Sequence, residues 1–311
     1  MRVVFLGSAE LACPCLDRLL ANTADMVVGV VTQPDRPKGR SLQTAPCPVR
    51  AHVGERGIPV LTPEMVNTPE SIQAIRALSP DLIVVVAYGQ ILKSGILAIP
   101  SQGCINVHAS LLPKYRGAAP IQWAIARGET KTGVTTMFLN AGMDAGDIID
   151  QAGEPIREDD TAGTLHDRLA ALGAELLART LDAIRQGTMR RTPQDPEEAT
   201  YASKLKKSDG RLDWALPARE LYNRIRGFNP WPGCFIELRQ PKPLLIKVLK
   251  ARVVPGQGQP GEILSVEGAG PVIQTGAQAL RLLEVQPEGR KVMPGAAFLC
   301  GHPLKVSDRL G

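Results

Sequence analysis

The apolar run Leu-Ile-Val-Val-Val-Ala at residues 82–87 constrains the fold of this chain most strongly. It is continuous and rich in β-branched side chains, which is typical of a central parallel strand covered by helices on both faces. Two more apolar segments, 2–7 and 26–32, flank a stretch with leucines at helical spacing, 10–21. This strand–helix–strand order predicts an α/β fold with a doubly wound, Rossmann-like, mostly parallel sheet.

The same alternation continues through the first 188 residues. Apolar patterns predict further strands at 58–61, 103–108, 133–139 and 148–156. Helices are expected at 46–56, after Gly117 and at 161–186, where the leucines follow a helical period. The first turn, Gly7-Ser8-Ala9-Glu10, lacks the GxGxxG pattern, so we expect no dinucleotide there. Residues 33–42 combine two prolines, a glycine and three basic side chains, which predicts a polar loop at the functional edge of the sheet or a simple solvated connector.

The pattern changes after residue 186. Residues 187–210 lose periodicity, which predicts a linker, and one more helix is expected at 216–226. Short strands separated by Gly and Pro then follow, with a close around 295–306; they are expected at 234–239, 244–254, 261–266, 271–275 and 279–286. Such spacing is typical of a small, partly open, OB-like β-barrel. The predicted division is a first domain at 1–188, a linker at 189–207 and a C-terminal β-barrel domain at 208–311.

Composition excludes several classes of protein. A length of 311 residues suits two domains. No segment reaches the roughly 20 apolar residues that a membrane span needs. The N-terminus begins directly with a strand pattern, so neither a signal nor a transit peptide is expected. The six cysteines form no CxxC pair, which predicts reduced thiols in a cytoplasmic protein and no metal site.

The net charge of +5 is unevenly spread. Residues 206–311 hold 16 Lys and Arg against 9 Asp and Glu, a net charge of +7, whereas residues 1–205 carry −2. A basic C-terminal third on a nearly neutral body suggests a polyanionic partner such as a nucleic acid. The charge alone is equally compatible with a domain that is merely basic.

The segment Cys-Ile-Asn-Val-His at 104–108 carries the candidate chemistry. Side chains alternate along a strand, so Asn106 and His108 project to the same side, at the edge where open α/β sheets bind ligands. Asp144 follows another predicted strand, in a loop with two glycines. An amide can stabilise an oxyanion, an imidazole can take a proton, and a carboxylate can orient the imidazole. Because no Ser or Cys stands at nucleophile spacing, the pattern favours direct acyl transfer to an attacking group supplied by a substrate.

Each of these residues also has a structural interpretation. A single histidine in a buried strand is commonly a satisfied core residue, and an asparagine at a strand end commonly forms a turn. Asp144 beside glycines could form an Asx-type turn. The joint pattern Asn-x-His-x-Ser-Leu-Leu-Pro makes these interpretations weaker in combination. A proline in a tight active-site turn also leads us to hypothesise a cis bond between Leu112 and Pro113.

The pattern Asn106-Val107-His108-x-Ser-Leu-Leu-Pro-x-x-Arg-Gly resembles the signature of the folate-dependent formyltransferases. Four further motifs resemble the members of this family that act on methionyl-tRNA: TQPDRP at 32–37, VVAYG at 85–89, GAAPIQ at 117–122 and FNPWP at 228–232. The resemblance implies transfer of a formyl group from 10-formyltetrahydrofolate to the α-amine of initiator methionyl-tRNA, as a step in translation initiation. It also implies that Asn106, His108 and Asp144 are the catalytic residues and that no metal takes part.

The resemblance further implies binding residues on this chain. Those expected to bind the folate, largely through backbone groups, are Val86, Tyr88, Gly89, Ile91, Leu92, Ser110, Leu111, Leu112, Pro113, Asn140 and Asp144. The basic loop at 34–42 resembles the insertion that grips the acceptor end of the tRNA. Residues expected to bind tRNA are Arg36, Lys38, Arg40, Lys204, Lys206 and Lys207.

Other functions stay open on the residues alone. One is formyl transfer to another amine, such as an amino sugar nucleotide or glycinamide ribonucleotide, and another is hydrolysis of the formyl donor. A third is a non-catalytic RNA-binding protein on a degenerate enzyme scaffold. The basic C-terminal region argues against a small nucleotide acceptor, and the intact Asn-His-Asp set argues against loss of catalysis. No exposed apolar heptad is apparent, so we expect a monomer.

Overall fold

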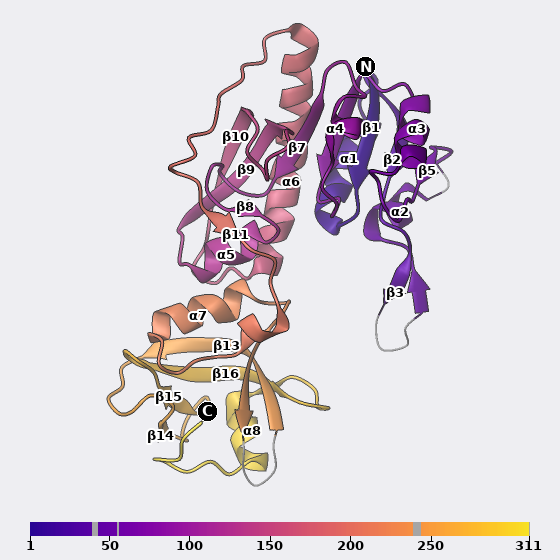
Figure 1. The fold of residues 1–311 in the computed structure, drawn as a ribbon. Helices are drawn as coiled ribbons and strands as arrows, with labels where there is room; N and C mark the ends of the chain where they lie inside the picture. The colour runs from indigo at the N-terminus through magenta and orange to yellow at the C-terminus, as the bar shows by residue number, and fades with distance from the viewer. Residues whose placement is uncertain (39–42, 55, 239–243, 311) are drawn as a thin grey trace. The chain divides into compact units, whose positions relative to one another are not determined.

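The computed structural model describes residues 1–311 except 39–42, 55, 239–243 and 311 (Figure 1). The chain forms two compact units. Unit 1 comprises Met1–Gly117, Lys131–Pro155 and His166–Ala202, and unit 2 comprises Ala118–Thr130, Ile156–Leu165 and Ser203–Gly311. Each unit is therefore assembled from segments that are distant in sequence. Within the described residues, no helix is long and apolar enough to span a membrane.

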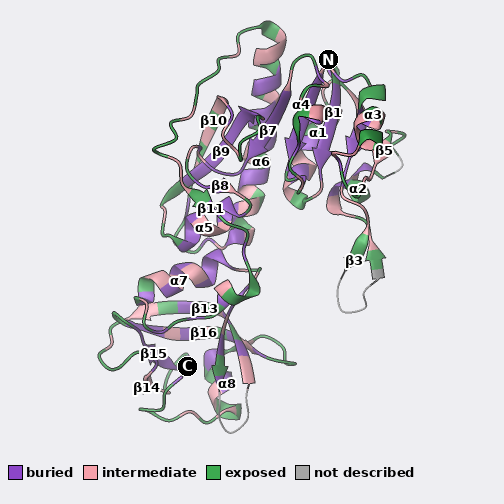
Figure 2. Cartoon of the chain, in the orientation of Figure 1, coloured by how far each residue is buried: buried purple, intermediate pink, exposed green. Residues whose placement is uncertain are grey.

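Unit 1 is built on a seven-stranded sheet with the order β10-β9-β7-β6-β1-β2-β5. The parallel strands are β1 (Arg2–Gly7), β2 (Met26–Val31), β5 (Val60–Leu61), β6 (Leu82–Val86) and β7 (Cys104–His108). β9 (Lys131–Phe138) and β10 (Ile148–Pro155) continue the sheet in antiparallel pairing. All five residues of β6 are buried, because this strand lies at the centre of the sheet with helices on both faces (Figure 2). The predicted mostly parallel, Rossmann-like sheet is confirmed.

Helices cover the two faces of this sheet with different sets of apolar side chains. On one face, α1 (Cys13–Leu20) and α6 (Ala162–Gln186) pack against strand residues such as Val86 and Val107. On the other, α3 (Pro69–Ala77) and α4 (Ser94–Leu97) pack against the alternate residues of β1 and β6. Residues 10–21 were expected to form one helix, and they begin with a short 3-10 turn, Glu10–Ala12, followed by α1 with Pro14 in its first turn. A further short helix in this unit is α2 (Pro48–Val53).

Two small pairings lie outside the main sheet of unit 1. β3 (Arg36–Lys38) and β4 (Gln43–Ala45) form an antiparallel hairpin, so the prediction of a plain polar loop at 33–42 is wrong for its described part. β8 (Arg116–Gly117) pairs in parallel with β11 (Tyr201–Ala202). Residues 201–202 belong to the segment that was expected to be a linker. Their pairing with β8 places this segment beside the residues that follow the Asn-x-His motif.

Unit 2 packs an antiparallel sheet against α5 (Pro120–Ala126) and α7 (Ala218–Gly227). The sheet has the order β12-β13-β16-β15-β14, with β17 added beside β16. Its strands are β12 (Cys234–Leu238), β13 (Leu244–Val254), β14 (Ile263–Ser265), β15 (Val272–Gln274), β16 (Ala279–Pro287) and β17 (Met293–Pro294). Trp123 of α5 meets Phe228 edge to face, with ring centroids 5.5 Å apart. The separate C-terminal β domain predicted from these short strands is confirmed, and its strands form an antiparallel sheet.

The last part of unit 2 differs from the prediction in one respect. The segment expected to close the barrel contains a helix, α8 (Gly295–Gly301), instead of a strand. Gly295 begins this helix against β16, where an added Cβ would lie 2.1 Å from the carbonyl oxygen of Leu282. The close approach of α8 to the sheet therefore requires glycine at this position.

Candidate functional site

The motif residues Asn106 and His108 lie on β7 at the C-terminal edge of the parallel strands. β7 pairs in parallel with β6 and antiparallel with β9, so it is hydrogen-bonded on both sides. Asn106 pairs with Val85 of β6, whose side chain belongs to the core face covered by α3 and α4. Asn106 and His108 therefore share that face, as the two-residue alternation predicts.

His108 is buried and held at one ring nitrogen. Its Nε2 lies 3.0 Å from the carbonyl oxygen of Tyr115. Because a carbonyl oxygen can only accept, Nε2 carries the proton in this contact, and Nδ1 of a neutral imidazole has its lone pair free. Nδ1 lies 3.7 Å from Oδ2 of Asp144, longer than a hydrogen bond but within ion-pair range. The structure thus directs Nδ1 of His108 and the carboxylate of Asp144 toward the same small region.

Asp144 reaches this region from the loop between β9 and β10. Its backbone has φ +47°, in the left-handed region that costs a non-glycine residue energy. Its Oδ2 accepts a 2.8 Å hydrogen bond from the backbone N–H of Gly117. Gly146 in the same loop packs so closely that a Cβ would lie 1.8 Å from the carbonyl oxygen of Phe138. The loop therefore has one defined conformation, which its hydrogen bond and its close backbone contact maintain.

Asn106 completes the group that the sequence analysis predicted. Its side chain is buried, and within the described part of the chain it makes no side-chain hydrogen bond. The amide atoms are not among the fully buried polar atoms that lack a partner in the described part of the chain, so solvent still reaches them. The amide group is therefore available to a ligand oxygen beside His108.

Residues expected to bind folate after β6 form a tight turn. Ala87 and Gly89 have positive φ angles of 45° and 92°. Tyr88 is buried in the core, burial raises its pKa to about 12, and its hydroxyl has no partner among the described residues. Ile91 is 73% exposed, whereas Leu92 is buried. Val86 points to the opposite face of the sheet from Asn106, so only its backbone could contact a ligand on that side.

The other folate-binding candidates lie in the turn after β7 and in the loop after β9. The Leu112–Pro113 bond is cis, as hypothesised. Ser110 donates through Oγ to the carbonyl of Lys114 at 2.7 Å, and Leu112 donates its N–H to Oγ1 of Thr135 at 3.1 Å. Leu111 is half-buried beside them. Asn140 is exposed and accepts at Oδ1 from the N–H of Gly142. These hydrogen bonds give both segments a defined conformation, and both lie at the same edge of the sheet as His108.

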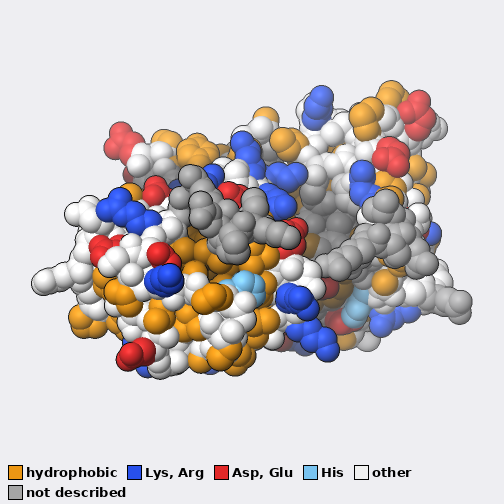
Figure 3. Space-filling model, turned by 90° about the horizontal axis from the view of Figure 1, so that it is seen from below, with side chains coloured by type: hydrophobic (Ala, Val, Ile, Leu, Met, Phe, Trp, Pro, Cys, Tyr) orange, Lys and Arg blue, Asp and Glu red, His pale blue; other side chains and the backbone are white. Residues whose placement is uncertain are grey.

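The candidates for tRNA binding divide between the two units. In unit 1, Arg36 lies on β3 with an exposed side chain, 3.7 Å from Glu64; Lys38 is on the same strand; and Arg40 is outside the described residues. In unit 2, the three lysines are all exposed and flank buried Leu205; they are Lys204, Lys206 and Lys207. On the face seen in Figure 3, Lys and Arg side chains are distributed among hydrophobic and acidic ones instead of forming a single patch.

Several residues at the site were not singled out from the sequence. The carbonyl of Tyr115 and the N–H of Gly117 hold His108 and Asp144, yet backbone groups leave no side-chain signal. Buried Arg116 lies between them, within the motif but without an assigned role. Gln194 contacts both Arg116 and the Asp144 loop from a segment that was expected to be linker. No sequence pattern could have placed Gln194, because its spacing from its partners is not local.

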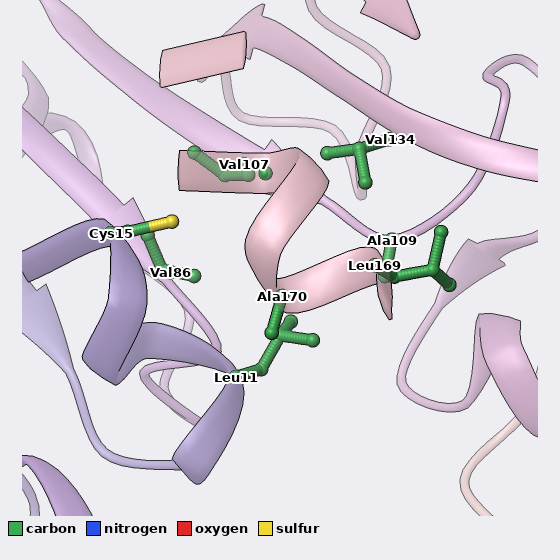
Figure 4. Close-up of a pocket in the computed structure, with 9 residues that line it drawn as sticks. Leu11, Cys15, Val86, Val107, Ala109, Val134, Leu169 and Ala170 are labelled. Carbon is green, nitrogen blue, oxygen red and sulfur yellow. The ribbon is translucent and has the colours of Figure 1, made fainter. Parts of the chain in front are cut away.

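An apolar gap in unit 1 lies on the other face of β7 (Figure 4). It is lined by aliphatic side chains and one thiol: Leu11, Cys15, Val86, Val107, Ala109, Val134, Leu169 and Ala170, with Gly173. Because Val107 lines the gap and neighbouring side chains of β7 point to opposite faces, the gap lies on the face of the strand away from His108. It offers no polar group for chemistry and is a small packing gap. No cluster of three or more potential metal ligands occurs among the residues that the structure describes.

Comparison with known proteins identifies the family of this chain. Residues 1–181 match the formyl transferase family, and residues 204–303 match the C-terminal domain of formyl transferase. Among solved structures, the sugar 3N-formyl transferase WlaRD, in the presence of dTDP and 5-N-formyl-THF, superposes with a TM-score of 0.68 at 18% identity. The alignment covers 94% of this chain and 99% of WlaRD. This likeness supports the fold.

Sequence relatives are more specific. A methionyl-tRNA formyltransferase of Citrifermentans bemidjiense is 49% identical over 311 residues, covering 100% of this chain and 96% of the relative. One from Geobacter sulfurreducens is 48% identical, covering 100% and 97%. One from Caldanaerobacter subterraneus is 47% identical over 307 residues, covering 98% of each. With both formyl transferase domains matched and identity near one half along the whole length, this chain belongs to the methionyl-tRNA formyltransferase family.

Proposed function

We propose that this protein transfers the formyl group of 10-formyltetrahydrofolate to the free α-amine of initiator methionyl-tRNA, giving formylmethionyl-tRNA. Relatives that carry this name are 44–49% identical over nearly the whole chain, which supports the activity. The observation that carries the mechanism is the state of His108: Nε2 is tied to the Tyr115 carbonyl while Nδ1 faces Asp144. That arrangement suits an imidazole that accepts one proton during the reaction.

The reaction then proceeds by direct attack of the amine on the formyl carbon. As the new C–N bond forms, the carbonyl oxygen becomes negative and accepts a hydrogen bond from the Asn106 amide. Nδ1 of His108 takes the proton that the attacking amine loses, and Asp144 stabilises the resulting imidazolium. Breaking the bond between the formyl carbon and the folate nitrogen, with return of the proton to that nitrogen, completes the transfer.

The chain's own side chains favour this route over a covalent enzyme intermediate. Cys104 lies on the same strand face as Asn106, but burial raises the pKa of its thiol to about 12, so it is not a thiolate at neutral pH. Ser110 uses its hydroxyl proton to bond the carbonyl of Lys114. Neither residue is activated as a nucleophile, and the amine of the second substrate takes that role.

We assign folate binding to the turn after β6 and to the segments 110–113 and 140–144. Their backbone groups lie at the carboxyl edge of the sheet, where ligands of open α/β folds bind. The exposed lysines at 204–207 and the β3–β4 hairpin with Arg36 and Lys38 are assigned to the tRNA phosphates. Phosphate contacts make affinity fall steeply with salt. Replacing Lys204, Lys206 and Lys207 together by Gln should flatten that salt dependence, and an unchanged slope would contradict the assignment.

We also propose that the protein acts as a monomer in the cytoplasm. All six cysteines are free in the structure, which suits a reducing compartment. Size-exclusion chromatography with light scattering checks the oligomeric state.

The decisive experiment offers the purified protein a choice of amines. It is incubated with 10-formyltetrahydrofolate and, in parallel, with charged initiator tRNA, an amino sugar nucleotide and glycinamide ribonucleotide. We expect formylation of the tRNA-linked methionine alone, and abolition of turnover by His108→Ala and by Asp144→Ala with retention of the folded state. Formylation of a small amine instead, or wild-type kcat in either variant, would refute the proposal.

A further inference from the structure

The loop that carries Asp144 is held by a glutamine from a distant part of unit 1. Nε2 of Gln194 donates to the carbonyl oxygens of Asp144 at 2.9 Å and Gly146 at 2.8 Å. Its Oε1 accepts from Nε of Arg116 at 3.1 Å and from Nη2 at 2.8 Å. A glutamine amide has two N–H donors and an oxygen with two lone pairs, so the two shorter bonds from Nε2 and the two to Oε1 match its capacity. Sδ of Met137 is a longer, third contact of Nε2 at 3.8 Å. Such complete satisfaction fixes the orientation of the amide.

Arg116 connects this amide to the groups that hold both catalytic side chains. The residue before it, Tyr115, presents its carbonyl to Nε2 of His108, and the residue after it, Gly117, donates its N–H to Oδ2 of Asp144. The Arg116 guanidinium is buried, and its backbone N–H donates to the carbonyl of Thr200 at 2.8 Å. The same short segment therefore anchors the imidazole, the carboxylate and Gln194.

The backbone of Asp144 needs such support. A left-handed conformation costs an L-residue on the order of 1 kcal/mol, and it persists only when its surroundings hold it. The carboxylate points toward His108 across 3.7 Å without a direct hydrogen bond between them. A small displacement of the loop therefore changes the interaction that stabilises a protonated imidazole.

We propose that Gln194 is a positioning residue for formyl transfer, acting through the two hydrogen bonds that it donates to the Asp144 loop. The inference rests on the proposed function, because Gln194 acts through Asp144, whose role in catalysis is part of that proposal. Arg116 supplies the fixed point from which the amide reaches the loop. The donors of Gln194, and not merely its bulk or its contact with Arg116, keep the carboxylate directed at His108.

Two variants separate these roles. Gln194→Ala removes both the donors and the acceptor. Gln194→Glu has nearly the same shape and still offers Arg116 an acceptor, now charged, but its carboxylate cannot donate to the carbonyls of Asp144 and Gly146. We expect both variants to lower kcat by about 10- to 100-fold, the scale of a misplaced catalytic group, with KM for the folate and for methionyl-tRNA within about twofold of wild type.

The control is Gln286→Ala, which removes a comparable 3.0 Å bond from a glutamine Nε2 to a backbone carbonyl in unit 2. It should keep wild-type kcat. Circular dichroism of each variant reports folding, and the isosteric Glu variant keeps the test valid if the Ala variant unfolds. Wild-type kcat in Gln194→Glu, or a raised KM with unchanged kcat, would overturn the positioning role. Failure of the proposed function is distinguished because the wild-type protein would then not formylate methionyl-tRNA, or Asp144→Ala would retain wild-type kcat as well.

Discussion

Replacing Asp144 by Asn removes one charge and little else. The Asn oxygen can still accept the bond that Gly117 donates to Oδ2, so the loop keeps its anchor. What is lost is a carboxylate 3.7 Å from Nδ1 of His108. Two unit charges about 4 Å apart interact by about 1 kcal/mol in bulk water and by about 4 kcal/mol at an effective dielectric constant of 20.

The burial of the pair decides between these limits. The side chain of His108 is 7% exposed and that of Asp144 16%, so solvent screens them only partly. We therefore expect a loss of about 2–4 kcal/mol of stabilisation when His108 gains its proton, which lowers kcat by about 30- to 1,000-fold. The measurement is the single-turnover rate of methionyl-tRNA formylation at saturating folate, read on acid gels.

Asp150→Asn supplies the matched control. It makes the same chemical change on β10, where Asp150 forms a surface ion pair with Arg179 at 2.8 Å, and exposed pairs of this kind contribute little. We expect its rate to stay within about twofold of wild type. If Asp144→Asn also stays within threefold, the carboxylate does not act electrostatically on His108 and the reasoning fails.

Three further outcomes concern stability. Gly173→Ala should raise the thermal midpoint, because alanine is favoured over glycine in the helix interior of α6 by about 1 kcal/mol. Its Cβ would lie 3.2 Å from Cγ1 of Val107, a tight contact that a shift of Val107 by a few tenths of an ångström into the apolar gap of Figure 4 relieves. Gly187 lies just beyond the end of α6 with φ +65°, where alanine is disfavoured, so Gly187→Ala should lower the thermal midpoint. A higher midpoint for Gly187→Ala than for Gly173→Ala would contradict both predictions. Burial raises the pKa of three thiols to about 12, namely those of Cys15, Cys104 and Cys234. Since an unfolded thiol titrates near roughly 8.5, the unfolded state loses these protons first, and the free energy of unfolding should fall from pH 8 to pH 10 by on the order of 1 kcal/mol per thiol. Urea unfolding at the two pH values checks this, and an equal stability at both would exclude the effect.

Regular elements were predictable where their pattern was long and periodic. The β-branched run of β6 and the leucine stripe of α6 each determine which faces are buried, and both are found as expected. The helix α3 was not assigned, although Thr68 caps its start by accepting from the N–H of Ser71. The hairpin β3–β4 and the helix α8 were also missed. These elements are short, and short elements are decided by what they pack against more than by their own residues.

The sequence by itself determined the mostly parallel sheet, the separate C-terminal domain of short strands, and the common face of Asn106 and His108. The physical reason is that strand alternation and hydrophobic periodicity are local properties. Only the tertiary structure decided that Nε2 of His108 is held by a carbonyl, that Asp144 adopts a left-handed backbone, and that Gln194 supports it. Those contacts join residues between 7 and 50 positions apart. The pairing of β8 with β11 brings the segment that follows Gln194 back beside the residues that follow β7.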